Sequence, residues 1–361
     1  MTEKRIIFRF KEIYKRISKQ FLFMVIKYLF GTRAAGRRFD GLVGSIVVLG
    51  QERFGDLIVL TPLIKKLRQA FPAAEIYLLG VTRMVNFLTD DTNLNKVVNI
   101  KRTKGKIRRN ILDRKFDLLF NTKDHPSFTF LLLTARIRAR YKIGIYHRVH
   151  LGYFDHMEYL DDDMPTVEKN MALVKFLGIS YKKADLRPYL SGDNPDAPMK
   201  EFVSGLSEKI IIGINLSASN QGKEWPFAYW DELLSVIKFP VIILAMPDDA
   251  DKKEVLEKKH IHVYPSPQTA TLTDAGYLIR RLNLLITPDT ALVHVAGCYN
   301  IPVVVLYRLE RDMKKFPPLS DHFRTLVSPT TDLGEIKPEM VAASVKDLFD
   351  KNLAKGAAPY K

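Results

Sequence analysis

The chain has 361 residues, a length typical of two domains rather than one small domain. Hydrophobic residues make up 47% and charged residues 27%, which excludes intrinsic disorder and collagen-like or other low-complexity sequence. The single cysteine, Cys298, excludes an internal disulfide framework and any zinc site built from cysteines alone, and it fits a reducing compartment.

The formal net charge of +16 favours an anionic partner: a nucleic acid, a membrane surface or an acidic substrate. Residues 1–40 carry a net +8 and residues 101–150 a net +11, so the rest of the chain is slightly acidic in sum. Either basic segment alone could be a solvated face of the protein. The presence of both favours an anionic partner.

The first element expected in chain order is a basic helix within residues 1–40. Its apolar residues recur at spacings of three and four: Ile6, Phe10, Ile13, Ile17, Phe21, Met24 and Tyr28. The most apolar part, residues 21–30, is far shorter than the roughly 20 residues that span a bilayer, and no secretory cleavage pattern follows it. We therefore expect a basic amphipathic helix on an anionic membrane surface. Packing of its apolar face on the protein's own core is the alternative.

From residue 45 onward, apolar strands alternate with amphipathic helices in two successive halves. The first half has predicted strands at 45–49, 75–79, 97–100 and 118–120, and predicted helices at 63–71 and 128–137. The second half has predicted strands at 209–216, 240–244, 284–287 and 302–307, and a predicted helix at 226–237 that begins with proline. Between the halves, residues 181–207 contain three prolines and little periodicity, which indicates a linker.

Continuous apolar strands that alternate with helices indicate an α/β fold with parallel sheets covered on both faces. The sequence thus predicts two Rossmann-like, doubly wound domains that face a central cleft, at 41–190 and 191–361, after an N-terminal helical region at 1–40. Ligands of such sheets bind beyond the carboxyl ends of the strands. Candidate residues are therefore sought in the loops that follow strands.

The first candidate loop, residues 51–62, follows the opening strand and lacks the G-x-G-x-x-G dinucleotide fingerprint. Gly55 permits a tight turn or the close approach of a ligand. Asp56 is a carboxylate suited to general-base catalysis. An aspartate at the start of a helix can equally be an N-cap residue.

The second candidate loop, residues 217–226, follows the first strand of the second half. Ser217, Ser219, Gly222 and Lys223, ahead of a helix N-terminus, are typical parts of an anion-binding cradle. The spacing of a P-loop is missing. An ordinary polar loop is the alternative.

The third candidate loop, residues 287–297, joins a strand to a helix. Free N–H groups at Thr290, Ala291 and Leu292 would face an anion at the start of the helix. His294 lies one turn further along and can donate a hydrogen bond to a phosphate oxygen or a leaving group. The alternatives are an N-cap role for Asp289 and a core position for His294.

Taken together, the three loops resemble glycosyltransferase family 9, the lipopolysaccharide heptosyltransferases of Gram-negative bacteria. The matching stretches are GDLIVLTPLIKKLRQAFPAAEIYLL (55–79), INLSASNQGKEWPFAYWDELL (214–234) and ITPDTALVHVAGCYNIPVVVLY (286–307). The last stretch resembles the pattern D-[ST]-[GA]-x-x-H-x-A-x-x-x-x-P. The resemblance covers roughly residues 45–350.

The resemblance implies a GT-B fold, with the acceptor bound to the first domain and a nucleotide-sugar to the second. It implies an inverting transfer that needs no metal and no other cofactor. Asp56 would then be the base that deprotonates the acceptor hydroxyl, and Asp249, with Asp248 as the alternative, would hold the ribose. The donor phosphates would be held by Ser217, Ser219, Lys223, Asp289, Thr290, Ala291, Leu292 and His294.

Three features depart from the family's pattern. Residues Ala245, Met246 and Pro247 stand where many members have glycines, so the nucleoside pocket is expected to be reshaped. Ala291 replaces the commoner glycine. The basic segment at 1–40 precedes the usual start of the family.

The resemblance implies transfer of heptose from ADP-heptose to the Kdo region of lipid A–core. The enzyme would be cytoplasmic and peripheral on the inner membrane, and an anionic, membrane-anchored acceptor would account for both basic segments. Two alternatives stay open: another nucleotide-sugar donor with another surface glycan, or a catalytically idle, membrane-associated glycan- or nucleotide-binding protein. Joint retention of Asp56, Lys223, Asp289 and His294 argues against the idle protein. No nucleic-acid motif accompanies the basic segments.

Overall fold

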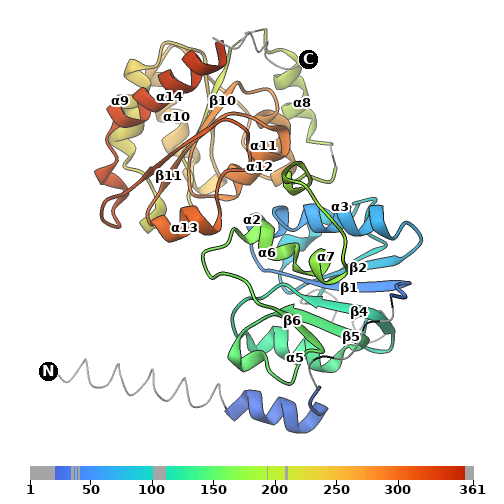
Figure 1. Ribbon diagram of the computed structural model, residues 1–361. Helices are drawn as coiled ribbons and strands as arrows, with labels where there is room; N and C mark the ends of the chain where they lie inside the picture. Colours follow the sequence, from blue (N-terminus) through green and yellow to red (C-terminus); the bar gives the residue numbers. More distant parts are fainter. Residues whose placement is uncertain are drawn as a thin grey trace, which may run out of the picture. The chain divides into compact units, whose positions relative to one another are not determined.

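The computed structural model describes residues 21–33, 36, 39, 41–100, 111–192, 194–207 and 210–353. These residues form two compact units, each assembled from separate stretches of the chain (Figure 1). Unit 1 contains the described residues up to Arg53, together with Leu63–Asp162 and Lys169–Ser180. Unit 2 contains Phe54–Pro62, Asp163–Glu168 and the described residues from Tyr181 onward. The units differ from the predicted domains in these two short segments, in residues 181–190, which group with unit 2, and in the described residues before 41, which group with unit 1.

Unit 1 is built on a six-stranded parallel sheet in the order β3-β2-β1-β4-β5-β6. Its strands are β1 (Ser45–Gly50), β2 (Glu75–Gly80), β3 (Lys96–Asn99), β4 (Lys115–Asn121), β5 (Arg138–Ile145) and β6 (His156–Glu158). The principal helices around it are α3 (Thr61–Ala70), α5 (Phe128–Arg136) and α7 (Ala172–Phe176), with 3-10 turns at Arg83–Leu88 (η1) and Arg148–His150 (η3). Helix α6 (Thr166–Asn170) is divided between the units after Glu168. The strand order reverses between β1 and β4, which makes their carboxyl ends the topological switch point.

Unit 2 repeats this plan with the order β12-β11-β10-β7-β8-β9, again all parallel. The strands are β7 (Ile212–Asn215), β8 (Val241–Leu244), β9 (Val263–Tyr264), β10 (Leu284–Pro288), β11 (Val303–Tyr307) and β12 (Phe323–Val327). The helices are α2 (Phe54–Ile58), α8 (Ala197–Ser204), α9 (Phe227–Val236), α10 (Ala250–Lys259), α11 (Leu272–Ile279), α12 (Ala291–Tyr299), α13 (Glu310–Lys315) and α14 (Pro338–Leu353), with 3-10 turns at Lys183–Leu186 (η4), Gln221–Lys223 (η5), Pro247–Asp249 (η6) and Leu333–Glu335 (η7). Its switch point lies between β7 and β10.

The central strands explain why their sequences are continuous apolar runs. Residues 46–49 of β1 and all of β10 are buried, because helices cover both faces of each sheet. In unit 2, the rings of Trp225 and Trp230 pack edge to face, with their centroids 4.6 Å apart. They belong to the core that also contains residues of β7, β8 and α14. These rigid sheets fix where the loops at their carboxyl ends lie.

The predicted linker is wrong over part of its length. Residues Ala197–Ser204 form α8, which begins after Asp196, whose side chain accepts a hydrogen bond from the backbone N–H of Met199 at 2.9 Å. Proline is compatible with the first turn of a helix, where its missing N–H has no partner to lose. Pro198 therefore marks the start of a helix here rather than a break.

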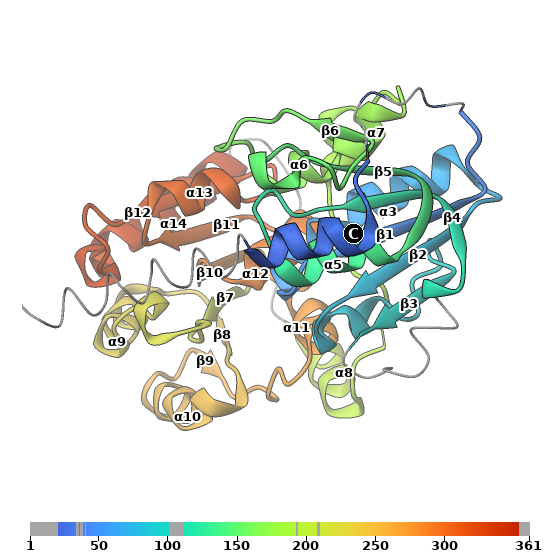
Figure 2. The same cartoon turned by 90° about the horizontal axis from the view of Figure 1, so that it is seen from below.

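Residues 21–30 are helical and lie along α5 in unit 1 (Figure 2). Phe23 and Ile26 are buried against Leu131 of α5, together with Tyr153 and Phe154. The Tyr153 hydroxyl donates to the Phe23 carbonyl at 2.8 Å. The alternative interpretation, in which an apolar face packs on the protein's own core, is therefore correct for the face that carries Phe23 and Ile26.

A different face of the same helix remains uncovered. Phe21, Met24 and Tyr28, which share a face at helical spacing, are all exposed. Residues 1–20, which carry most of the predicted basic helix, lie outside the described part of the chain. Among the described residues, no helix combines the length and apolar composition needed to cross a membrane.

Candidate functional site

A buried asparagine ties the loops together at the switch point of unit 2. Asn215, the last residue of β7, donates from Nδ2 to Thr287 Oγ1 at 2.9 Å and to Thr290 Oγ1 at 3.2 Å. The same amide donates to the Ser217 carbonyl at 3.0 Å. The second and third candidate loops therefore lie side by side, as expected for loops that follow neighbouring parallel strands.

The two charged residues of these loops form an ion pair. Lys223, at the end of η5, donates to the carboxylate of Asp289, which directly follows β10. Only 18% of the Lys223 side chain and 13% of the Asp289 side chain are exposed. This shielding makes the pair a fixed feature of the loops. It also leaves a Lys ammonium group beside the start of α12.

Ser217 and Asp249 also meet, as their joint assignment to the donor predicts. The Ser217 hydroxyl donates to Asp249 Oδ2 at 2.6 Å and accepts from the Met246 N–H at 2.8 Å. Burial opposes ionisation of Asp249, but hydrogen bonds from Lys252 and Ser217 outweigh it and lower the pKa of the carboxyl. Asp248 is exposed. Asp249 is therefore the better placed of the two predicted ribose ligands.

The start of α12 differs from the expectation. Thr290, not Asp289, is the N-cap residue, and its hydroxyl accepts from the Leu292 N–H at 3.3 Å. The Leu292 N–H is thus not free for an anion. The Asp289 N–H donates to the Leu306 carbonyl at 3.0 Å. Ser219 is exposed, where its hydroxyl accepts from the side chain of Asn220 at 3.3 Å.

His294 is a buried, neutral residue. Burial lowers the pKa of its imidazole to about 4, so the ring is uncharged near neutral pH. Its Nδ1 has no hydrogen-bond partner among the described residues. The ring packs near Phe316, with centroids 5.9 Å apart, and lies against Gly55. These surroundings are those of a core histidine, the alternative named above, and the predicted hydrogen bond from His294 to a donor phosphate stays a prediction.

Gly55 allows α2 to approach α12 closely. A Cβ at Gly55 would lie 3.3 Å from His294 Cδ2 and 3.8 Å from the Ala291 Cα. Asp56 follows as the third residue of α2 and is half-buried, so it is not an N-cap. The predicted base and the predicted donor loops thus belong to one compact unit.

Arg308 is a site residue that the motifs did not identify. It directly follows β11. Its Nη1 lies so close to Gly222 that a Cβ added to this glycine would be only 2.9 Å from it. Its Nε donates to the Thr331 carbonyl at 2.9 Å. A second cation therefore lies beside the loop that carries Lys223. The signal available in the sequence was its place immediately after a predicted strand.

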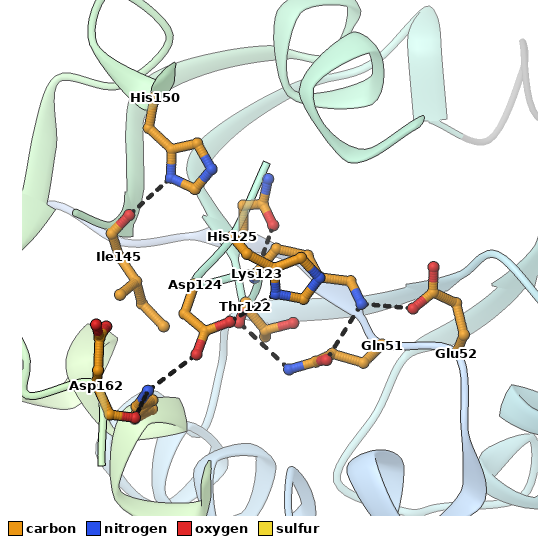
Figure 3. Close-up of polar contacts among 11 residues, drawn as sticks. Gln51, Glu52, Thr122, Lys123, Asp124, His125, Ile145, His150 and Asp162 are labelled. Carbon is orange, nitrogen blue, oxygen red and sulfur yellow. Dashed lines mark hydrogen bonds and ion pairs between the residues drawn. The ribbon is translucent and has the colours of Figure 1, made fainter. Parts of the chain in front are cut away.

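The switch point of unit 1 is also polar (Figure 3). Thr122, after β4, donates from Oγ1 to the Leu49 carbonyl of β1 at 2.8 Å. Lys123 pairs with Glu52 and donates to Gln51 Oε1 at 3.3 Å, which links the loops after β1 and β4. The polar run from Asn121 to His125 directly after an apolar strand was the sequence signal for this cluster.

A second set of contacts surrounds Asp124 in the same loop. Asp124 Oδ2 accepts from Lys169 Nζ at 2.9 Å, and Oδ1 accepts from His125 Nδ1 at 2.8 Å. The hydrogen bond from His125, with that from Lys169, holds the pKa of Asp124 well below its usual range despite its burial. The carboxylate is therefore ionised near neutral pH.

Several described cations of the basic segment at 101–150 have structural partners. Arg114 pairs with Glu75, and Arg140 Nη1 lies 3.4 Å from Asp117 Oδ1, both at the amino ends of strands. Buried Lys142 donates to carbonyls at the end of α5. Residues 101–110 lie outside the described part. These three cations thus lie away from the carboxyl ends of the strands, whereas Lys123 of the same segment lies at the switch point. No group of three or more potential metal-ligating side chains occurs in the described ranges.

Comparison with known proteins agrees with this architecture. The family profile described as "Glycosyltransferase family 9 (heptosyltransferase)" matches residues 104–342. Lipopolysaccharide heptosyltransferase 3 of Escherichia coli is 25% identical over 280 residues, which cover 70% of this chain and 80% of the relative. The family profile spans more than half of the sequence, including strands β4, β5 and β6 of the first sheet and the whole second sheet.

Two solved structures share the fold. A glycosyltransferase family 9 protein from Veillonella parvula superposes with a TM-score of 0.68 at 18% identity, covering 85% of this chain and 97% of that one. The ADP-heptose lipopolysaccharide heptosyltransferase II of E. coli gives a TM-score of 0.66 at 21% identity, with coverages of 87% and 100%. The chain is a glycosyltransferase with the GT-B fold, and it belongs to glycosyltransferase family 9, the heptosyltransferase family.

Proposed function

We propose that this enzyme transfers heptose from ADP-heptose to the Kdo-containing inner core of lipid A–core, with inversion at the anomeric carbon. Family membership and the lipopolysaccharide heptosyltransferases among its relatives support the reaction class. The observation that carries the proposal is the joining of Lys223 to Asp289 and of Ser217 to Asp249 at one switch point. These are the groups that a nucleoside diphosphate requires: a cation for the phosphates and a carboxylate for the ribose.

Lys223 would bind the donor diphosphate, with Asp289 holding the ammonium group in place until the anion arrives. Arg308 would add a second cation to the same loop. Charge builds on the diphosphate as the bond to the sugar breaks, so cations and helix N–H groups that are fixed in advance lower the barrier. This arrangement would stabilise the ADP leaving group without a metal or other cofactor.

Asp249 would accept hydrogen bonds from the ribose hydroxyls. Its orientation is set by Ser217, which also binds the backbone at Met246. Asp56 would take the proton from the attacking acceptor hydroxyl. A carboxylate positioned within reach of that hydroxyl is sufficient for general-base catalysis.

The enzyme would act as a peripheral protein on the cytoplasmic face of the inner membrane. The exposed face formed by Phe21, Met24 and Tyr28, next to the basic sequence at 1–20, supports this location. Apolar side chains that enter the headgroup region and cations that attract anionic lipids act together in such helices.

A family 9 enzyme with another nucleotide-sugar donor is the second candidate. One observation favours it: exposed Met246 replaces a small residue beside the Ser217–Asp249 pair, which reshapes the nucleoside side of the site.

The deciding experiment incubates the purified enzyme with Kdo2-lipid A and a panel of nucleotide-sugars and identifies products by mass spectrometry. The expected result is one added heptose with ADP-heptose alone. Addition of another sugar would favour the second candidate, and absence of any product with every donor would contradict the proposed transfer.

A further inference from the structure

Within the described residues, three carboxylates each accept from one histidine and one lysine. They are Asp124 with His125 and Lys169, Glu158 with His156 and Lys175, and Asp231 with His260 and Lys259. The contact distances are similar, from 2.6 to 2.9 Å. Distance alone therefore does not distinguish a functional group from ordinary surface ion pairs.

Exposure separates the first group from the other two. Lys175 and Lys259 have 61% and 58% of their side chains exposed, whereas their histidines are more covered, at 37% and 9%. At Asp124 the order is reversed: Lys169 is 5% exposed and His125 is 62% exposed. A lysine is costly to bury, so Lys169 serves as an internal support that holds Asp124 for the exposed imidazole.

The loop that carries His125 is fixed from several sides (Figure 3). Asn121 receives the Lys123 N–H on Oδ1 at 3.0 Å and donates to Thr134 Oγ1 at 3.0 Å. Buried His150 donates from Nδ1 to the Ile145 carbonyl at 2.8 Å. The backbone of His125 opposes the lowering of the His150 pKa by burial, so the two residues are neighbours. The side chains at 121–124 make hydrogen bonds or ion pairs with other residues of unit 1. The imidazole of His125 is the part of the loop that faces solvent.

The contact with Asp124 also fixes the chemistry of the imidazole. An ionised carboxylate accepts the Nδ1–H, so Nε2 is the ring nitrogen left for a ligand. Lys123 pairs with Glu52 and Lys169 with Asp124, so both lysines of this cluster already have a carboxylate partner. This arrangement suits a hydroxyl group, which can hydrogen-bond to Nε2, better than an anion. Its location, at the switch point of a doubly wound sheet, is where such sheets bind ligands.

We propose that His125 contacts the acceptor, with Nε2 accepting a hydrogen bond from a hydroxyl of the acceptor sugar. Asp124 and Lys169 are positioning residues, since they act through the imidazole. This assignment rests on the proposed transfer of a sugar to a glycan acceptor and adds a specificity-determining residue to unit 1.

The test compares His125→Ala and His125→Gln with the matched control His156→Ala, whose histidine is also held by a carboxylate and a lysine. A neutral hydrogen bond to a sugar predicts a rise in the acceptor KM of roughly three- to tenfold for His125→Ala. His125→Gln retains an acceptor oxygen and falls between that variant and the wild type. The donor KM and the melting temperature stay unchanged in all three variants.

Direct binding of deacylated Kdo-oligosaccharide, followed by the imidazole NMR signals, separates this inference from the proposed function. Transfer by the wild type with equal acceptor binding by His125→Ala overturns the inference and leaves the function standing. Weakened oligosaccharide binding by His125→Ala, with no transfer by the wild type from any donor, supports the inference and contradicts the function. Absence of oligosaccharide binding to the wild type overturns the inference.

Discussion

At the scale of single residues, Asp56 carries the sharpest prediction. Replacement of Asp56 by Asn should lower kcat by about 10²–10⁴, because a general base contributes a factor of that size. ADP affinity should stay unchanged, since the proposed donor contacts come from other loops. Steady-state kinetics and calorimetry measure the two quantities. Asp248→Asn, at an exposed carboxylate, is the control. Turnover near the wild-type value in Asp56→Asn would exclude this residue as the base.

Lys223→Ala should weaken ADP binding by about ten- to 150-fold, because a charge-assisted hydrogen bond to phosphate contributes roughly 1.5–3 kcal/mol. The structure adds a second effect: the variant leaves the shielded carboxylate of Asp289 unpaired beside the phosphates. Asp289→Asn in the Lys223→Ala background should therefore restore part of the affinity. Lys258→Ala removes an exposed lysine of the same unit, which pairs with Glu254 on the same helix, and serves as the control. Unchanged ADP binding by Lys223→Ala in calorimetry would contradict the phosphate assignment.

His294 should make the fold sensitive to acid. Its pKa falls from 6.5 to about 4 in the folded protein because the ring is buried. Between these values the unfolded chain binds the proton and the folded chain does not. The free energy of unfolding therefore has its full value above pH 6.5. It decreases by up to about 3 kcal/mol as the pH falls toward 4.

Urea unfolding at pH 7 and pH 4.5 measures this loss. His294→Leu should show a smaller decrease in the free energy of unfolding than the wild type, even where its stability at pH 7 is lower. The change in this free energy with pH measures proton binding by His294, whereas its value at pH 7 also depends on packing. His150 and His262, whose pKa values are also lowered by burial, should retain a smaller share of the slope. Equal slopes for the wild type and His294→Leu would contradict the predicted titration.

At the scale of elements, the contact between α2 and α12 determines whether replacing Gly55 by Ala stabilises or destabilises the fold. Gly to Ala in a helix is favourable by up to about 1 kcal/mol when the added methyl group has room. In Gly55→Ala that methyl group lies 3.3 Å from the His294 ring, so the variant should be destabilised and should lose kcat through displacement of Asp56. In a His294→Ala background the same substitution should become stabilising.

A double-mutant cycle of thermal or urea unfolding measures this coupling. Gly205→Ala, at the end of α8 where only backbone oxygens lie near the added atom, provides the comparison. Additive effects of Gly55→Ala and His294→Ala would show that the two helices do not constrain each other through this contact.

The comparison of expectation with structure also belongs to this scale. The central strands of both sheets were predictable, because burial on both faces demands unbroken apolar runs such as residues 46–49 and 303–306. β5 was not predicted, since arginines at positions 138 and 140 interrupt its apolar pattern. Its charges are accommodated at the amino end, where Arg140 reaches Asp117. β9 has only two residues, too few to give a pattern.

The site was predictable only as separate loops. Lys223 and Asp289 are 66 residues apart, and their pairing follows from the adjacency of β7 and β10 in the sheet, which local sequence does not encode. The burial of His294 depends on a helix that lies more than two hundred residues earlier in the chain. The Asp124–Lys169 contact likewise joins two separate elements of unit 1. Long-range contacts of this kind decide which polar residues are supports and which face a ligand.

At the scale of the whole molecule, the N-terminal helix has a structural role and a proposed membrane role, and deletion of residues 1–40 would affect both. Phe23 and Ile26 belong to the core of unit 1, and Arg33 binds the carbonyls of Ala139 at 2.7 Å and Arg140 at 3.2 Å. Removing these anchors should lower the melting temperature whatever the membrane does. The exposed face of Phe21, Met24 and Tyr28 makes a separate test possible.

Replacement of Phe21, Met24 and Tyr28 together by Ser should reduce binding to anionic vesicles while the melting temperature and the turnover on a soluble acceptor stay close to the wild type. Deletion of residues 1–20 should do the same, because each Lys or Arg near an anionic membrane contributes up to about 1 kcal/mol, less when many act together. Phe23→Ala should instead lower stability, by about 3–5 kcal/mol for a buried Phe, with little change in lipid binding per folded molecule. Co-sedimentation at increasing salt, alongside thermal melts, measures both properties. Binding to vesicles should fall steeply with salt, since the screening length is only about 8 Å at physiological ionic strength. Unchanged vesicle binding by both the triple variant and the truncation would contradict a membrane role for this helix.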